Sequence, residues 1–138
     1  MEINIMSGFI IISICSGILF AILDGVINAN PLAQRLYQVY KPIAKKSINP
    51  LAGIVIDLLF GFIMAGIFLL LYDSLPGETG FIKGLSFAVL VWFFRVVMQA
   101  GSQWVMFRIP AAALLYSLVA GLVEMLILGA VYGLALRP

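Results

Sequence analysis

Residues 91–104 read VWFFRVVMQAGSQW and place an arginine, Arg95, inside a run that otherwise suits the interior of a lipid bilayer. The composition of the whole chain decides whether such a run belongs to a soluble core or to a membrane. Of the 138 residues, 64% are hydrophobic and 10% are charged, whereas soluble domains have about 45–50% apolar and about 25% charged residues. The sequence therefore predicts an integral membrane protein, and its length suits a single membrane domain over residues 1–138.

Four apolar segments are long enough to cross roughly 30 Å of hydrocarbon at about 1.5 Å per residue. They are residues 7–28, 51–72, 81–106 and 111–136. The tetrapeptide Asn-Pro-Leu-Ala occurs at 30–33 and at 49–52, and Asn followed by Pro is typical of a helix N-cap and first turn. The first copy predicts a short amphipathic helix over residues 31–41. We therefore predict an all-α fold, a four-helix antiparallel bundle in the membrane with a short interfacial helix between the first and second spans.

Basic residues outside the membrane interior lie mainly on one side of these spans. Five belong to the two loops on one side, and two lie on the other. The first set is Arg35, Lys41, Lys45, Lys46 and Arg108, and the second is Lys83 and Arg137. Because cytoplasmic loops carry an excess of Lys and Arg, we expect a multi-pass protein of the cell (plasma) membrane with loop 29–50 in the cytoplasm and both termini outside.

Each predicted span carries one ionisable side chain, namely Asp24, Asp57, Arg95 and Glu124 in chain order. An isolated charge near the bilayer centre costs about 2.5–3.5 kcal/mol on insertion scales. The four side chains should therefore turn inward and meet. Counting residues from the helix starts predicts that Arg95 pairs with Asp24, with Asp57 or with both. The same count places Glu124 nearer the middle or outer half, so its contact with Arg95 is less strongly predicted.

Polar residues that share the helix faces of this cluster are predicted to line the same interior surface. They are Asn28 in the first span, Gln99, Ser102 and Gln103 in the third, and Ser117 in the fourth.

Three acids and one base would leave a net charge of minus two, which a bound proton or cation would relieve. Glu124, the acid least obviously within reach of Arg95, is the expected proton carrier. One interpretation makes the cluster a site for proton- or cation-linked transport of a small solute. The alternative is a structural or accessory subunit of a membrane complex, with the cluster as a packing clasp. An anionic ligand at Arg95 and a lipid-modifying enzyme are less favoured, since the latter needs an interfacial nucleophile or metal.

One cysteine and no histidine argue against a C-x-x-C redox pair, a zinc site of the usual spacing, histidine-ligated haem and histidine-based triads. We expect no enzymatic activity, no catalytic residue, no metal, no cofactor and no nucleic-acid partner; the expected environment is the lipid bilayer. Gly129 and Gly133 have the spacing of a helix-dimer seam and could form a homodimer, with internal packing as the alternative.

The stretch LPGETGFIKGLSF at residues 75–87 is followed by a Trp and an Arg in the third span and by a fourth helix that begins after a Pro. Over about residues 51–135 this arrangement resembles small uncharacterised prokaryotic membrane proteins with four transmembrane helices. The resemblance implies the fold and no particular activity.

Overall fold

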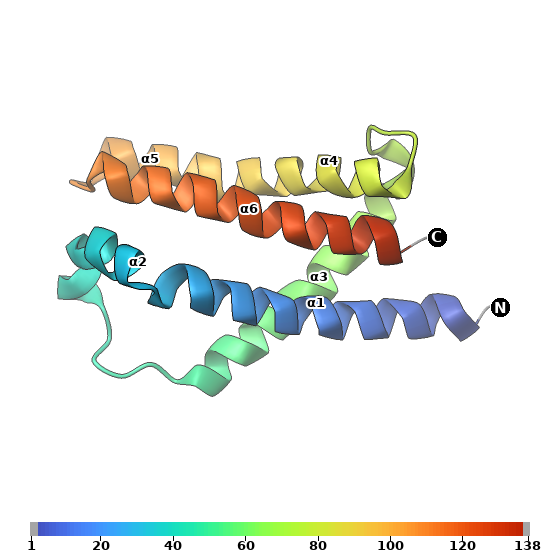
Figure 1. Ribbon diagram of the computed structural model, residues 1–138, viewed down its shortest axis with the longest axis horizontal. Coiled ribbons are helices and arrows are strands. Elements are labelled where there is room, and N and C mark those ends of the chain that lie inside the picture. Colours follow the sequence, from blue (N-terminus) through green and yellow to red (C-terminus); the bar gives the residue numbers. More distant parts are fainter. Residues whose placement is uncertain (1–2, 137–138) are drawn as a thin grey trace.

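A computed structural model describes residues 3–136, and the regular elements in that range are all helical (Figure 1). In chain order they are α1 (Ile3–Ala29), α2 (Pro31–Leu36), η1 (Tyr37–Ile43), α3 (Pro50–Leu71), η2 (Tyr72–Ser74), α4 (Gly80–Trp92), η3 (Phe93–Val97), α5 (Met98–Met106) and α6 (Ala111–Ala135). The elements η1 and η2 are 3₁₀ helices, and η3 is a short π-helix between α4 and α5. Stretches long and apolar enough to cross a membrane are Met6–Ala29, Pro50–Ser74, Gly80–Met106 and Ala111–Ala135. The predicted all-α fold with four spans is confirmed.

Both Asn-Pro-Leu-Ala copies begin a helix, as predicted. The side chain of Asn30 accepts a hydrogen bond from the backbone N–H of Ala33 at 2.9 Å, and Asn49 caps α3 in the same way. These bonds satisfy backbone donors that the first helical turn leaves unpaired. The interfacial segment differs from the predicted helix over 31–41, because α2 gives way to the 3₁₀ helix η1, which continues through Pro42 and ends at Ile43.

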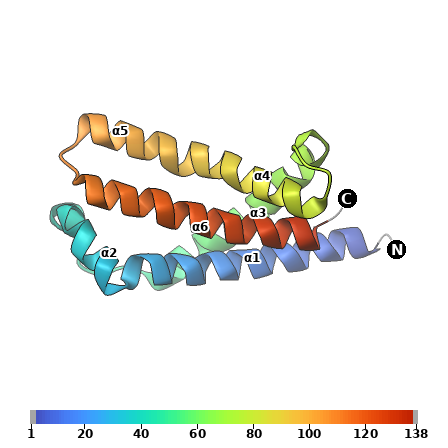
Figure 2. The ribbon, with the colours of Figure 1, turned by 45° about the horizontal axis from the view of Figure 1, so that its top comes forward.

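The four spans form two helix pairs that meet along α1 and α6. Helix α4 packs along α6, and α1 packs on α3, whereas the contact between α1 and α6 is smaller. Figures 1 and 2 show α3 crossing α1 obliquely, while α4–α5 and α6 run side by side over their full length. The start of α1 and the end of α6 lie at the same end of the bundle.

Glycines hold α4 and α6 at close range. A Cβ on Gly84 would overlap the carbonyl oxygen of Gly129, and a Cβ on Gly133 would overlap that of Gly80. Such small residues let membrane helices approach closely. Gly129 and Gly133 therefore face α4 of the same chain, which is the internal packing that the sequence analysis gave as the alternative to a homodimer seam. A dimer would need another face of α6.

Aromatic side chains fill the half of the bundle where α1 begins and α6 ends. The ring of Phe68 on α3 lies 5.4 Å from that of Phe87 on α4 and 5.9 Å from that of Tyr132 on α6, measured between centroids. The first half of α3 behaves differently, since it diverges from the bundle, and a Cβ on Gly53 would meet open space. One half of the bundle is therefore filled, whereas α3 leaves the other half open.

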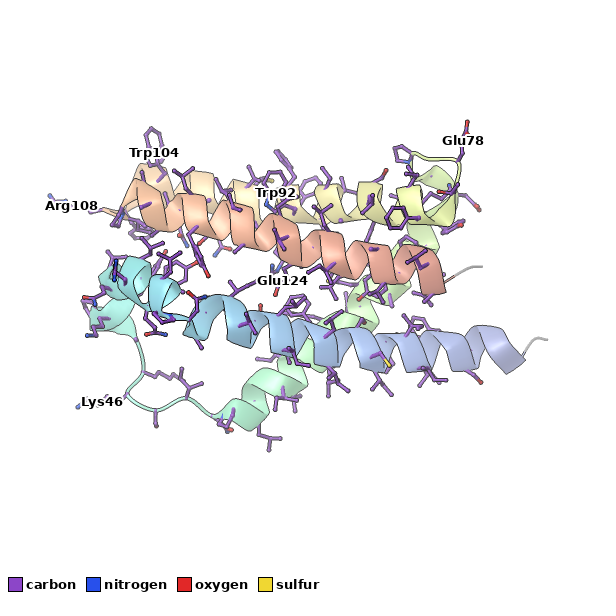
Figure 3. All side chains as sticks on the ribbon, in the orientation of Figure 1. Lys46, Glu78, Trp92, Trp104, Arg108 and Glu124 are labelled. Atoms are coloured by element: carbon purple, nitrogen blue, oxygen red, sulfur yellow. The ribbon has the colours of Figure 1, made fainter. Side chains whose placement is uncertain are left out.

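The two ends of the bundle differ in charge. Figure 3 shows Lys46 and Arg108 at the end that carries α2, and Glu78 at the opposite end. We call the end formed by α2, η1 and the loop 107–110 the basic end. The open half of the bundle adjoins it.

Candidate functional site

A cavity of about 250 Å³ lies between α1, η1, α5 and α6, in the half of the bundle that α3 leaves open. It extends from Arg95 and Glu124 to η1 at the basic end. Its polar lining residues are Asp24, Asn28, Tyr37, Tyr40, Arg95, Gln99, Gln103, Ser117 and Glu124. Since Asn28 and Gln99 are also exposed at the surface, the lining is continuous with the outside of the bundle.

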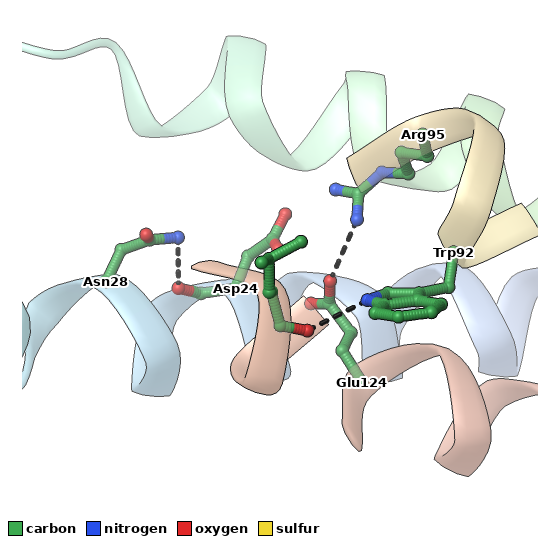
Figure 4. Close-up of polar contacts among 6 residues, drawn as sticks. Asp24, Asn28, Trp92, Arg95 and Glu124 are labelled. Atoms are coloured by element: carbon green, nitrogen blue, oxygen red, sulfur yellow. Dashed lines mark hydrogen bonds and ion pairs between the residues drawn. The ribbon is translucent and has the colours of Figure 1, made fainter. Parts of the chain in front are cut away.

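Arg95 forms an ion pair with Glu124 across the α4–α6 seam (Figure 4). The distance from Arg95 Nη1 to Glu124 Oε1 is 3.3 Å, and the two side chains are 38% and 3% exposed respectively. The Arg95 guanidinium carbon also lies 5.0 Å from the centre of the Phe20 ring on α1, an arrangement that attracts a cation to the ring face. Arg95 therefore joins η3 to both α6 and α1 at the inner end of the cavity.

The predicted pairing of Arg95 with Asp24 or Asp57 is wrong, because in the described part of the chain its ion-pair partner is Glu124. The prediction depended on counting residues from helix starts. The glycine seam instead fixes the register of α4 against α6 and places Val96 beside Gly121, one turn before Glu124. Close packing of two backbones thus brings Glu124 to the level of Arg95.

The three acids do converge, as a row with Asp24 in the middle. Asp24 is a side-chain neighbour of both Glu124 and Asp57, and Arg95 is near enough to attract the latter two. Asp57 approaches from α3 and is not part of the cavity lining. Glu124 Oε2 is buried and, within residues 3–136, accepts no hydrogen bond. The side chain beside Glu124 is another acid, Asp24, so a proton or cation between the two carboxyl groups would relieve their repulsion.

Ser102 is a second correction, since it is exposed and lies outside the cavity lining. The other predicted polar lining residues all line the cavity. The prediction treated the third span as one straight α-helix with Arg95 and Ser102 on the same face. The π-helix η3 turns less per residue than an α-helix, so it changes the phase of α5 relative to Arg95. Gln99 and Gln103 face the cavity, and Ser102 points away.

Tyrosines near the basic end form a layer that the sequence analysis missed. Tyr37 and Tyr40 on η1 line the cavity. The Tyr37 hydroxyl shares a hydrogen bond of 2.8 Å with Ser117 Oγ, and the Tyr40 hydroxyl donates to Gln103 Oε1 at 3.1 Å. Burial raises the pKa of the Tyr37 phenol above 10.0, which the hydrogen bond with Ser117 partly offsets. These bonds fasten η1 over α5 and α6.

A third tyrosine holds the start of α2 in place. Tyr116 on α6 donates a hydrogen bond of 2.5 Å to the Ile27 carbonyl oxygen and accepts one of 2.8 Å from Asn30 Nδ2. Its ring lies 5.7 Å from that of Tyr37, edge to face. The amphipathic pattern of residues 31–41 predicted only a helix in the interface. No local signal identified the partners on α5 and α6.

The fold and the cavity define a multi-pass membrane protein with four spanning helices and a polar interior confined to one half of the bundle. A family model matches residues 2–137, and the chain belongs to that family, described as a family of unknown function (DUF6789). The predicted resemblance to an uncharacterised family of four-helix membrane proteins is thereby confirmed. No curated protein and no solved structure matches the chain.

Proposed function

We propose that this protein is a proton- or cation-linked transporter of a small solute in the cell membrane, and that the cavity is its binding site. The observation that carries the proposal is Glu124, which is 3% exposed and lies beside Asp24 at the inner end of a polar cavity. One of its carboxylate oxygens has no hydrogen-bond partner among the described residues. Ionisable groups inside a membrane commonly mark the path of an ion or a proton.

The row of acids supports movement of a proton rather than simple neutralisation. Asp24 is a side-chain neighbour of both Glu124 and Asp57, so one proton could pass along the three carboxyl groups. Arg95 compensates one negative charge and holds the inner end of the row. A structural clasp would need only the ion pair between Arg95 and Glu124. It would give no role to Asp24, to Asp57 or to the cavity beside them.

The packed half of the bundle supports a state open toward the basic end. Phe20, Met125 and Leu128 are fully buried in the apolar core, between the cavity and the opposite end. If the basic end is cytoplasmic, with loop 29–50 inside and both termini outside, this state faces the cytoplasm. Release on the other side would then require separation of the packed aromatic half.

The role of an accessory subunit remains the second candidate because of an apolar groove of about 360 Å³ between α5 and α6. Ala100, Gly101 and Ala111 line it together with larger apolar side chains, among them Trp104 and Leu118. An apolar groove with small residues in its lining suits a helix of another membrane protein. The size of the complex extracted from native membranes in mild detergent separates the two candidates, since a transporter would migrate as this chain alone or as its own oligomer.

Proteoliposomes with a trapped pH-sensitive dye test the transport proposal. A pH gradient is imposed, and small amines, carboxylates and monovalent cations are added in turn. At least one class should dissipate the gradient with the wild type and fail to do so with Glu124→Gln. The matched control is Glu78→Gln, which neutralises an exposed acid at the far end of the bundle. Folded wild-type protein that moves protons with none of these solutes, or no faster than Glu124→Gln, would refute the proposal.

A further inference from the structure

We propose that the ligand of the cavity is a small organic cation, an amine or quaternary ammonium, held between Asp24 and the rings of Tyr37 and Tyr40. The inference names the substrate class of the proposed transporter and in that respect rests on the proposed function. The binding site itself can be tested without transport.

Charge is the first reason. The ionisable groups that face this region come from every element around it. They are Asp24 on α1, Asp57 on α3, Arg95 on η3, Glu124 on α6, and the phenols Tyr37 and Tyr40 on η1. Arg95 and Glu124 neutralise each other at 3.3 Å. The charge left over in the cavity is the carboxylate of Asp24, with Asp57 behind it, so the lining favours a positive ligand.

Aromatic lining is the second reason. The rings of Tyr37 and Tyr40 lie 5.7 Å apart in an edge-to-face arrangement. A hydrogen bond between the Tyr37 hydroxyl and Ser117, and one from the Tyr40 hydroxyl to Gln103, hold the two rings in position. Aromatic rings attract ammonium groups and are the usual means by which proteins recognise quaternary amines. A metal ion holds its water shell tightly and would gain less from such rings than an alkylated ammonium, which is only weakly hydrated.

Size sets the third limit. The cavity volume of about 250 Å³ is below the roughly 300–1,000 Å³ of pockets that hold drug-sized molecules. The ligand is therefore a compact amine rather than an extended aromatic cation. The basic residues of the basic end, such as Arg35 and Lys41, are not part of the lining. They are exposed at the surface, and salt screens charges there.

An anionic ligand is the rival that Arg95 raises. Its guanidinium is already held by Glu124 and by the ring of Phe20. An anion that reached it would also meet the carboxylate of Asp24. The structure therefore gives Arg95 the role of positioning Glu124 rather than that of binding the ligand.

Binding of tetramethylammonium to the purified protein in detergent, measured by isothermal titration calorimetry, tests the inference. The neutral isostere tert-butyl alcohol and the anion acetate serve as comparison probes. We expect saturable binding of tetramethylammonium, with affinity at least about tenfold higher than for either comparison probe. Asp24→Asn should weaken it by about tenfold or more, and Tyr37→Leu by about three- to tenfold.

Matched variants separate the ring from the fold. Tyr37→Phe keeps the ring and loses the hydrogen bond with Ser117, so it should weaken binding less than Tyr37→Leu does, and Ser117→Ala, which breaks the same hydrogen bond from the other side, should match Tyr37→Phe. Phe94→Leu removes a ring that faces lipid, at 63% exposure, and should have no effect. Each variant is first shown to elute as the wild type does in size-exclusion chromatography.

Equal binding of the neutral isostere, tighter binding of acetate, or full affinity in a folded Asp24→Asn variant would overturn the inference. Its failure is distinct from failure of the proposed function. Gradient-driven transport of carboxylates without tetramethylammonium binding would leave the transporter and remove the cation site. Binding of tetramethylammonium that depends on Asp24, in a protein that moves no protons, would leave the site and remove the transporter.

Discussion

The ion pair between Arg95 and Glu124 allows a quantitative prediction by a double-mutant cycle. At the observed 3.3 Å, Coulomb attraction is about 5 kcal/mol for an effective dielectric constant of about 20 and about 1.3 kcal/mol in bulk water. Glu124 is 3% exposed, but Arg95 is 38% exposed, so the effective environment lies between these limits. We expect a coupling free energy of about 2 kcal/mol between the two side chains.

The single variants should be unequal. Arg95→Met leaves a buried carboxylate without its partner and should destabilise the fold by about 3 kcal/mol. Glu124→Gln removes the charge, keeps the shape and should cost about 1 kcal/mol. With the expected coupling, the double variant should cost about 2 kcal/mol and be more stable than Arg95→Met alone.

Reversible unfolding by SDS in mixed micelles, followed by far-ultraviolet circular dichroism, gives these free energies. Arg35→Met, which removes an exposed basic side chain of α2, is the control and should change stability by less than about 0.5 kcal/mol. The reasoning is refuted if the effects of Arg95→Met and Glu124→Gln add within about 0.5 kcal/mol, because additive effects mean that the two side chains do not interact.

Three further predictions use the same unfolding assay. Gly84→Ala should destabilise the fold by about 2 kcal/mol or more, because its Cβ would overlap the backbone of α6. The control is Gly66→Ala, where the added Cβ meets open space, and it should be neutral or slightly stabilising. Equal effects of the two substitutions would contradict the close packing of α4 on α6. Lys83→Met should cost about 1–3 kcal/mol, since its ammonium donates to two carbonyl oxygens just beyond α3 at 2.6 and 3.1 Å; an unchanged midpoint would argue against this cap. Burial raises the pKa of Tyr37, so its neutral form adds stability that is complete below about pH 10 and lost as the pH rises through the raised value. The stability of wild type relative to Tyr37→Phe should therefore fall above pH 10, and a constant difference would show that the phenol is not buried.

Much of the fold follows from the sequence because the bilayer imposes strong constraints. Long apolar runs have to be helices, and the two Asn-Pro pairs have the chemistry of helix starts. The cost of isolated charges was enough to predict that one ionisable residue from each span would turn inward. Asp24, Arg95 and Glu124 are found together around one cavity, with Asp57 behind Asp24.

Partner choice within the cluster could not be predicted, because it depends on features that no single helix encodes. The seam between Gly84 and Gly129 sets the level of Glu124 against Arg95, and a seam of this kind requires knowing which helices are neighbours. The π-helix η3 changes the direction in which the side chains of α5 point relative to Arg95, and Ser102 therefore points away from the cavity. Tyr37 was missed because its partner Ser117 lies 80 residues away in the chain.

Water access to the cavity can be measured at two adjacent positions of α6. In a Cys15→Ala background, cysteine is placed at Ala120, which lines the cavity, or at Val119, which is 63% exposed on the lipid face at the same depth. Right-side-out and inside-out vesicles are treated with a membrane-impermeant methanethiosulfonate. A polar cavity open at the basic end predicts that Ala120→Cys reacts rapidly from the side bearing loop 29–50, while Val119→Cys stays unreactive from both sides. Equal reactivity of the two cysteines, or reaction of Ala120→Cys from the opposite side alone, would contradict it.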